Sequence, residues 1–163
     1  MKMAKSFLRK PACLKMADSM ATGYLFDTGF LTLALTASLP EKWIRPWNEI
    51  IKRGKAGYII EPVIAETCYQ LMTKKGINKK LSKNYIIKMK SLDSINILNL
   101  DDNDSFKASL YRTRFSIFSL SLVDCFILAT ANRRKLKIYT TDEPLKRVAK
   151  KINVSYNYVS IQS

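Results

Sequence analysis

From Tyr24 onward, short apolar runs alternate with longer stretches whose apolar residues recur at helical spacing. A short apolar run without polar alternation is typical of a strand that is buried on both faces. Strands that alternate with helices favour right-handed crossovers and therefore a parallel sheet. We expect an α/β fold, a three-layer sandwich around a parallel central sheet of roughly five strands. The expected strands are Tyr24–Asp27, Tyr58–Ile60, Ile95–Asn99, Lys137–Thr140 and Ser155–Ser160, and the expected helices are Phe30–Ala37, Glu41–Arg53, Pro62–Lys75, Lys79–Leu92, Asp102–Arg114, Leu122–Arg134 and Pro144–Lys150.

The 163 residues correspond to one domain, and the first 21 differ from the rest. Residues 1–21 hold five basic residues, one acid and three internal methionines. We therefore expect residues 22–163 to form a single domain, and residues 1–21 to be a basic extension or a mis-assigned start. The latter segment lacks the apolar stretch of a secretory signal. The most apolar stretch, 115–131, carries Asp124 at its middle, which argues against a membrane span, so we expect a cytoplasmic protein without a membrane partner.

The charge balance and the missing histidine narrow the chemistry. The chain carries 28 Lys and Arg against 13 Asp and Glu, a formal net charge of +15, and it has no histidine. Such a charge indicates a polyanionic partner, most often nucleic acid, although a lysine-rich solubilising surface is the alternative. The absence of histidine excludes Ser-His-Asp and Cys-His catalysis and histidine zinc sites. Cys13, Cys68 and Cys125 are too widely spaced for a zinc knuckle, so we expect free thiols.

The sequence also lacks the glycine-rich phosphate loops and the nucleophile elbow of common α/β enzymes. Ligands of parallel sheets bind beyond the carboxyl ends of the strands. The residues that stand at these ends are carboxylates. Asp27 and Asp142 close two expected strands, while Glu66 and Asp124 stand in the first turns of two expected helices.

Each of these acids has a structural alternative. Asp27 and Asp142 precede helices and suit N-caps, and Asp124 forms a capping-box pattern with Ser121. Glu66 could be a solvated residue of a helix face. Taken together, a parallel sheet brings the four acids into one cleft, where they repel one another and raise each other's pKa. A divalent cation removes that repulsion, and oxygen-only ligands favour Mg²⁺ or Mn²⁺. On a basic protein, this pocket suits phosphodiester hydrolysis.

Four stretches around these acids resemble the PIN-domain family, and within it the VapC-type toxins of toxin–antitoxin pairs. The resemblance covers roughly residues 22–160. It implies a five-stranded parallel sheet and metal-dependent cleavage of RNA. It also implies a homodimer that a small antitoxin neutralises by placing a basic residue in the acidic pocket. The matching stretches are Tyr24–Thr28, Glu61–Thr67, Ser121–Ala131 and Ile138–Glu143.

By this resemblance, Asp27 and Asp124 are the main metal ligands, and Glu66 and Asp142 complete the catalytic quartet. Thr28 and Thr140 match hydroxyl positions that support the acids. Gly29 departs from the polar residue that is commoner in the family.

Basic runs beside the fourth expected strand are candidates for contacts with RNA phosphates, and a solvated helix face is the alternative. The residues concerned are Arg133, Arg134, Lys146 and Arg147. The lysines at 74, 75, 79, 80 and 83 are open to the same two interpretations. Boundary residues predict a helix start at Pro62, a helix end at Gly76 and N-caps at Asp102 and Asp142.

The sequence therefore predicts a Mg²⁺- or Mn²⁺-dependent endoribonuclease, the toxin of a toxin–antitoxin pair, with RNA as substrate. Two alternatives remain open. One is a PIN nuclease of RNA processing or maturation. The other is a catalytically silent, basic RNA-binding scaffold whose four acids serve as helix caps.

Overall fold

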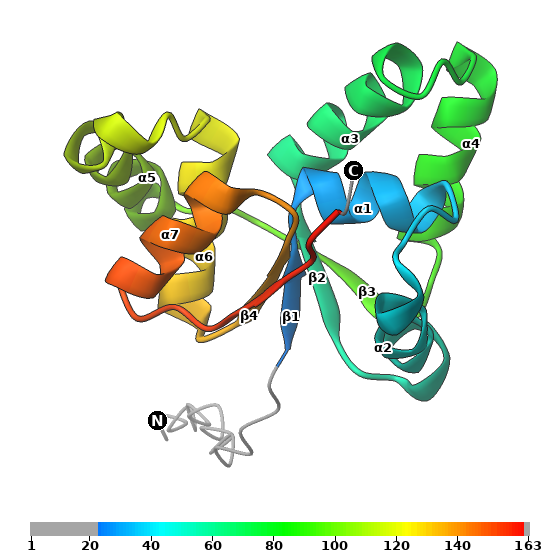
Figure 1. The fold of residues 1–163 in the computed structure, drawn as a ribbon, viewed down its shortest axis with the longest axis horizontal. Helices are drawn as coiled ribbons and strands as arrows, with labels where there is room; N and C mark the ends of the chain where they lie inside the picture. The colour runs from blue at the N-terminus through cyan, green and yellow to red at the C-terminus, as the bar shows by residue number, and fades with distance from the viewer. Residues whose placement is uncertain (1–22, 162–163) are drawn as a thin grey trace, which may run out of the picture.

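A computed structural model describes residues 23–161, and the expectation about residues 1–21 lies outside this range. Five strands form one sheet, and every strand pairs in parallel with its neighbours (Figure 1). The strands are β1 (Tyr24–Phe26), β2 (Gly57–Ile60), β3 (Ile95–Leu98), β4 (Lys137–Thr140) and β5 (Tyr156–Tyr158). The helices are α1 (Thr28–Leu35), α2 (Glu41–Arg53), α3 (Glu61–Thr73), α4 (Lys79–Lys90), α5 (Asp102–Arg114), α6 (Leu122–Arg134) and α7 (Glu143–Lys151), with a short 3-10 turn, η1 (Ser116–Phe118), between α5 and α6.

The strand order β3-β2-β1-β4-β5 places the amino-terminal strand at the centre of the sheet. The chain moves outward from β1 to β3, returns across the sheet to β4, and then continues to β5. Right-handed crossovers in these two directions put α1 to α4 on one face and α5 to α7 on the other, as Figure 1 shows. The direction of winding reverses between β1 and β4, and ligands of such sheets bind in the crevice at this point.

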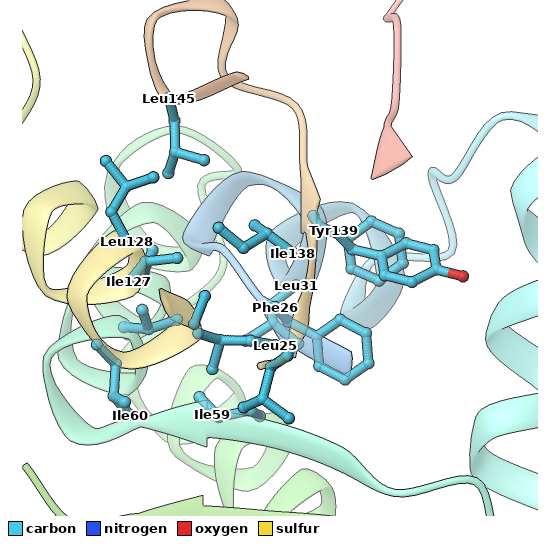
Figure 2. Packing of buried hydrophobic residues seen from close by; sticks show 14 of the residues in the cluster. Leu25, Phe26, Leu31, Ile59, Ile60, Ile127, Leu128, Ile138, Tyr139 and Leu145 are labelled. Atoms are coloured by element: carbon cyan, nitrogen blue, oxygen red, sulfur yellow. The ribbon is translucent and has the colours of Figure 1, made fainter. Parts of the chain in front are cut away.

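The two faces of the sheet are packed differently. Phe26 of β1 stacks on Phe30 of α1 with ring centroids 5.3 Å apart, and Trp47 of α2 contacts both rings edge-on. On the opposite face, Leu25 of β1 lies under aliphatic side chains of α6 and α7. Figure 2 shows Ile127, Leu128 and Leu145 gathered there, and all are fully buried. This continuous core holds both halves of the sheet in one rigid unit.

The expected elements are all present, with small shifts at their ends. Helix α1 begins at Thr28 instead of Phe30, because Asp27 caps it by accepting a hydrogen bond from the Phe30 N–H. Helix α3 begins at Glu61, one residue before Pro62, and Gly76 adopts a positive φ of 64° just beyond it.

One expected N-cap is wrong. Asp101, and not Asp102, caps α5, because Asp101 and Asp104 form a reciprocal capping box at the required spacing. Cys68 and Cys125 are free thiols, as expected, but only Cys125 is buried, whereas Cys68 is half-buried. Cys13 lies outside the described residues. Among residues 23–161, no helix is both long enough and apolar enough to cross a membrane.

Candidate active site

Asp27 stands at the carboxyl end of the central strand and is 3% exposed. Its Oδ1 accepts the Phe30 N–H at 2.6 Å, which caps α1. Its Oδ2 accepts the hydroxyl of Thr140 and the N–H of Thr141, both from the end of β4. Because β1 and β4 are parallel neighbours, the end of one strand supplies the donors for the carboxylate of the other. The cap interpretation of Asp27 is therefore confirmed, and the same carboxylate also faces the sheet edge.

Burial raises the pKa of Asp27 to about 7. The hydrogen bonds from Thr140, Phe30 and Thr141 oppose this shift, and the negative charge of Asp124 adds to it. A carboxyl group with a pKa near neutrality keeps its proton in part at physiological pH unless a cation arrives. Without a bound cation, the negative charge on the buried Asp27 carboxylate is therefore unfavourable.

Asp124 is the third residue of α6 and completes the capping box of which Ser121 is the N-cap. Its backbone N–H donates to the Ser121 hydroxyl at 3.0 Å, and its Oδ2 accepts from both the N–H and the hydroxyl of Ser121. Its Oδ1 makes no hydrogen bond to any described residue. Burial raises the pKa of Asp124 to about 6 against the hydrogen bonds from Ser121, and the charges of Asp142 and Glu66 raise it further. The capping box is confirmed, and it leaves one oxygen of the carboxylate available.

Two threonines of α1 align the side chains of α3. The Thr28 hydroxyl donates to Glu66 Oε2 at 2.7 Å, and one turn later the Thr32 hydroxyl donates to Gln70 Oε1 at 3.3 Å. The two threonines are four residues apart on α1, and Glu66 and Gln70 are four residues apart on α3. The two pairs are therefore successive contacts between the same faces of the two helices. Glu66 is therefore held by a specific partner and is not a freely solvated residue.

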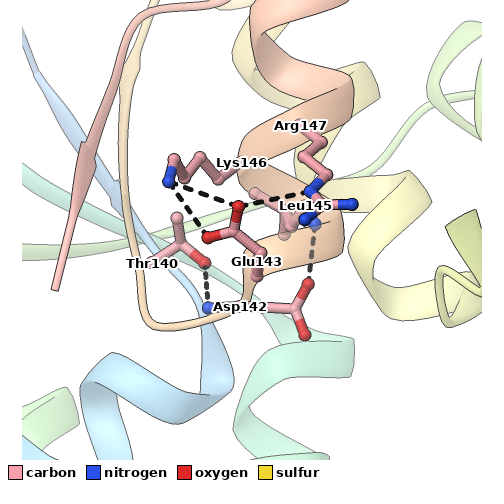
Figure 3. Close-up of polar contacts among 6 residues, drawn as sticks. All are labelled: Thr140, Asp142, Glu143, Leu145, Lys146 and Arg147. Carbon is pink, nitrogen blue, oxygen red and sulfur yellow. Dashed lines mark hydrogen bonds and ion pairs between the residues drawn. The ribbon is translucent and has the colours of Figure 1, made fainter. Parts of the chain in front are cut away.

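Asp142 follows β4 and caps α7, as expected (Figure 3). Its Oδ1 accepts the Leu145 N–H at 2.6 Å, and its own N–H donates to the Thr140 hydroxyl at 2.9 Å. The other carboxylate oxygen makes no hydrogen bond within the described part of the chain. The Thr140 hydroxyl thus serves Asp27 and Asp142 at once.

All four acids line one pocket of about 550 Å³ at the carboxyl edge of the sheet. The electrostatic couplings of Asp27 with Asp124, and of Asp124 with both Asp142 and Glu66, agree with this gathering. Thr28 and Thr141 also line the pocket, whereas Thr140 is fully buried behind Asp27. The structure therefore brings together the four acids that the sequence singles out.

The donor set suits a hard divalent cation, because it consists of carboxylates. Burial, and to a smaller extent the negative charge of neighbouring acids, raises the pKa of Asp27 and of Asp124. Asp124 and Asp142 each have an oxygen free of hydrogen bonds to the described residues. As the side chains lie, no three acidic or thiol groups among residues 23–161 form a group that could hold a metal ion. The residues fit the ion in chemistry, although their side chains as placed do not form a ready set of ligands.

Three of the four basic residues expected to contact RNA are engaged in ion pairs. Arg133 donates to both oxygens of Asp104 at 2.8 and 2.5 Å, which ties α6 to α5. Lys146 and Arg147 both pair with Glu143, at 3.0 and 3.2 Å (Figure 3). None of these cations lines the pocket. Arg134 is exposed at the end of α6, likewise outside the pocket lining.

The pocket also contains residues that sequence reasoning did not assign to it. Gln70 of α3 forms one wall together with Lys74 and Lys75, which directly follow the helix, and Thr141 lies beside Gly29. A Cβ at Gly29 would lie only 2.0 Å from the Thr141 hydroxyl oxygen. The glycine therefore leaves room for a hydroxyl that another part of the chain supplies. The spacing of Glu66, Gln70 and Lys74, four residues apart, is the sequence signal for the wall.

Residues 24–151 match the sequence model of the PIN domain. No curated protein sequence matches the chain. Solved structures with a similar fold include VapBC2 from Rickettsia felis, bound to a DNA fragment from its promoter. That structure has a TM-score of 0.63 and 18% identity, and the match covers 85% of this chain and 99% of that one.

Two further structures are similar. VapC20 from Mycobacterium tuberculosis, described as a sarcin-ricin loop cleaving toxin, has a TM-score of 0.62 and 15% identity over 77% of this chain and 94% of that one. FitAcB from Neisseria gonorrhoeae has a TM-score of 0.56 and 16% identity over 82% and 95% of the respective chains. These identities support a common fold. The family model spans β1 to α7 and includes all four acids, so the chain belongs to the PIN domain family.

Proposed function

We propose that the protein is a divalent-metal-dependent endoribonuclease that hydrolyses RNA phosphodiester bonds. The observation that carries the proposal is the gathering of Asp27, Glu66, Asp124 and Asp142 in one pocket at the switch point of the sheet. Four acids without a cation partner in the pocket core are costly for a protein that binds a polyanion, because they repel the ligand. A bound Mg²⁺ or Mn²⁺ turns that cost into an attraction for phosphate.

In this proposal, Asp27 and Asp124 are the main ligands, and Glu66 and Asp142 complete the shell from opposite walls. When bound, the divalent ion activates water and stabilises the negative charge that develops on the phosphate. The protein's own part is positional. Thr28 fixes the carboxylate of Glu66, and the capping bonds of Asp124 and Asp142 fix one oxygen of each while leaving the other for a ligand. Such supporting bonds determine how well a ligand set is oriented.

We further propose that the protein acts in the cytoplasm as the toxin of a toxin–antitoxin pair. The similarity to VapBC2 and to a toxin that cleaves the sarcin-ricin loop supports this role. The proposed partners are a cognate antitoxin, with a basic residue in the acidic pocket, and a second copy of the chain. Co-expression with the product of a small adjacent gene, followed by size-exclusion chromatography with light scattering, tests both. A monomer that no such product binds or inhibits argues for the RNA-processing alternative.

The nuclease proposal is tested with Asp27→Asn and Asp124→Asn in an RNA cleavage assay with Mn²⁺. Both variants should lose cleavage, whereas the matched control Asp93→Asn, an exposed acid outside the pocket, should cut like the wild type. Mn²⁺ binding measured by calorimetry should fall in the same two variants. If both variants cut RNA like the wild type, the site is wrong.

One observation favours the non-catalytic alternative: Asp27 and Asp142 are helix N-caps, and Asp124 completes the capping box of α6. Under that alternative, each Asp→Ala change costs about 0.5–2 kcal/mol of stability, Asp→Asn costs little because asparagine caps about as well, and neither change affects Mn²⁺ binding. Wild-type protein that binds RNA but never cuts it, with or without Mn²⁺, would establish the scaffold role.

A further inference from the structure

The wall of the acidic pocket that follows helix α3 changes from negative to positive charge along its length. Glu66 and Gln70 are four residues apart and lie on one face of α3, and Lys74, the C-cap residue, follows at the same spacing. All three line the pocket. From Glu66 to Lys74 the helix rises about 12 Å. Along this distance the wall passes from a carboxylate, through a neutral amide, to a cation. Lys75 stands beside Lys74 at the same outer rim.

The amide in the middle of this wall is oriented by its neighbour. The Thr32 hydroxyl lies 2.8 Å from the Thr28 carbonyl oxygen and 3.3 Å from Gln70 Oε1, and its one hydrogen is shared between these acceptors, so the amide oxygen faces α1. The two N–H donors of Gln70 have no partner among the described residues. Donors at this position suit an anionic oxygen inside the pocket.

The outer rim continues into the most basic part of the described chain. Between positions 74 and 90 there are seven lysines and no acidic residue. Helix α4, whose positive dipole end begins at Lys79, follows directly after the rim (Figure 1). The exposed lysines nearest the rim that form no ion pair within the described part of the chain are Lys74, Lys75, Lys79, Lys80 and Lys83.

The cations on the other side of the pocket differ in this respect. Lys146 and Arg147 share Glu143, and Arg133 is held by Asp104. A phosphate that binds them must compete with these carboxylates. A phosphate that binds the α3 rim displaces only water and counterions, which is the favourable case for a polyanion.

We propose that Gln70, Lys74 and Lys75 form a subsite for backbone phosphates of the RNA that flank the scissile bond. The strand leaves the acidic pocket over the carboxyl end of α3 and continues toward the lysines of α4. This inference rests on the proposed ribonuclease function and adds the side of the pocket on which the substrate runs. The subsite explains how an acidic pocket holds a polyanion, because the attraction lies beside the acids and not among them.

The test measures binding without cleavage. Fluorescence anisotropy of a short fluorescein-labelled single-stranded RNA, in EDTA and over a series of salt concentrations, is compared for the full-length wild type and for Lys74→Gln/Lys75→Gln. The variant should bind about tenfold more weakly, and its slope of log affinity against log salt should fall by about 1.4 for two lost phosphate contacts. Lys74→Arg/Lys75→Arg should restore both values, and Gln70→Leu should weaken binding without changing the slope.

A charge-matched control is Lys42→Gln/Lys52→Gln, which removes two exposed lysines of α2 away from the pocket. It should keep the wild-type slope. Lys146→Gln/Arg147→Gln tests the cations of α7, which do not line the pocket. An equal loss in all three double variants, or a larger loss at α7, overturns the subsite. The subsite is also overturned if polyglutamate displaces the labelled RNA as well as unlabelled RNA does.

Failure of the subsite and failure of the ribonuclease function give different results. If the wild type neither binds nor cuts RNA, the proposed function fails. If the wild type cuts RNA with Mn²⁺ while Lys74→Gln/Lys75→Gln binds it with unchanged affinity and slope, the subsite fails and the ribonuclease function stands.

Discussion

Thr140 at the end of β4 donates its hydroxyl hydrogen to Asp27 at the end of β1, across the point where the winding of the sheet reverses. The same hydroxyl accepts the N–H of Asp142. A single buried oxygen therefore sets the positions of two acids that come from different strands. The hydrogen bond to Asp27 is also the strongest influence that lowers the pKa of this carboxyl group.

Replacing Thr140 with Val should weaken the site while keeping its shape. The change removes the donor to Asp27 and leaves the Asp142 N–H without its partner, so the free energy of unfolding should fall by about 1–3 kcal/mol. The pKa of Asp27 should rise above about 7, and Mn²⁺ affinity near neutral pH should fall about 10–100-fold. Calorimetric Mn²⁺ titration measures this effect. Thr140→Ser, which keeps the hydroxyl, is the control, and wild-type Mn²⁺ affinity in the Val variant would contradict the assigned role.

The metal-free protein should become less stable as the pH rises from 5 to 7.5. Asp27 has a pKa of about 7 in the folded protein, against an ordinary value of 3.8, so the folded state holds its proton more tightly. Its contribution to stability is complete below the unfolded value and is lost as the pH rises through the folded value. Asp124, at about 6, acts in the same direction. The expected loss is on the order of 3 kcal/mol.

Denaturant unfolding in EDTA across this pH range measures the loss. The acids whose pKa is lowered, Asp104, Glu49 and Glu143, act only at lower pH and do not mask it. Asp27→Asn should flatten the pH profile, whatever its effect on absolute stability. A wild-type profile that is already flat between pH 5 and 7.5 would show that Asp27 is not strained.

Gly29 should tolerate a side chain only when Thr141 is shortened. An alanine within a helix usually stabilises by up to about 1 kcal/mol relative to glycine. Here the new Cβ would overlap the Thr141 hydroxyl at 2.0 Å, so Gly29→Ala should destabilise by about 1–2 kcal/mol. In a Thr141→Ala background the same change should become neutral or stabilising. Thermal unfolding of the four proteins gives the coupling, and strict additivity would argue against the contact.

Removing Arg133 should destabilise the protein through α5 and α6. Asp104 is 1% exposed, and burial would raise its pKa, but the hydrogen bonds and charge of Arg133 hold the pKa below its ordinary value. Arg133→Ala leaves this carboxylate buried without its partner, at a cost of about 2–4 kcal/mol. Chemical denaturation measures the change, with the neighbouring Arg134→Ala as control. Equal stability of the two variants would mean that the ion pair contributes nothing.

Much of the fold follows from local patterns. The helix caps at Asp142 and Ser121 are formed with residues only three positions further along the chain, so the local sequence predicts them. The ends of the strands are predicted in the same way from the residues next to them. The turn η1 differs because Ser119 adopts a positive φ of 54° without a glycine or asparagine to mark it. A conformation that surrounding packing imposes leaves no local signal.

The candidate site also has features that the sequence predicts and features that it does not. The four acids are predictable because each stands at the end of a strand or at the start of a helix, and a parallel sheet gathers such positions. The sequence treats helix capping and metal binding as alternatives, whereas the carboxylate of Asp124 caps with one oxygen and keeps the other. The pairing of Arg133 with Asp104 could not be foreseen, since 29 residues separate them, whereas Glu143 lies three and four residues from its partners and gives a local signal.

The central position of β1 has a consequence for biosynthesis. Asp27 is made early, but Thr140, which completes its hydrogen bonding, follows 113 residues later. A growing chain on the ribosome therefore carries the first acid without the strand that positions it, and the pocket assembles only when β4 docks beside β1. A chain cut before β4 lacks the pocket altogether instead of having a weaker one. The complete set of four acids is therefore present only after residue 142 has been added.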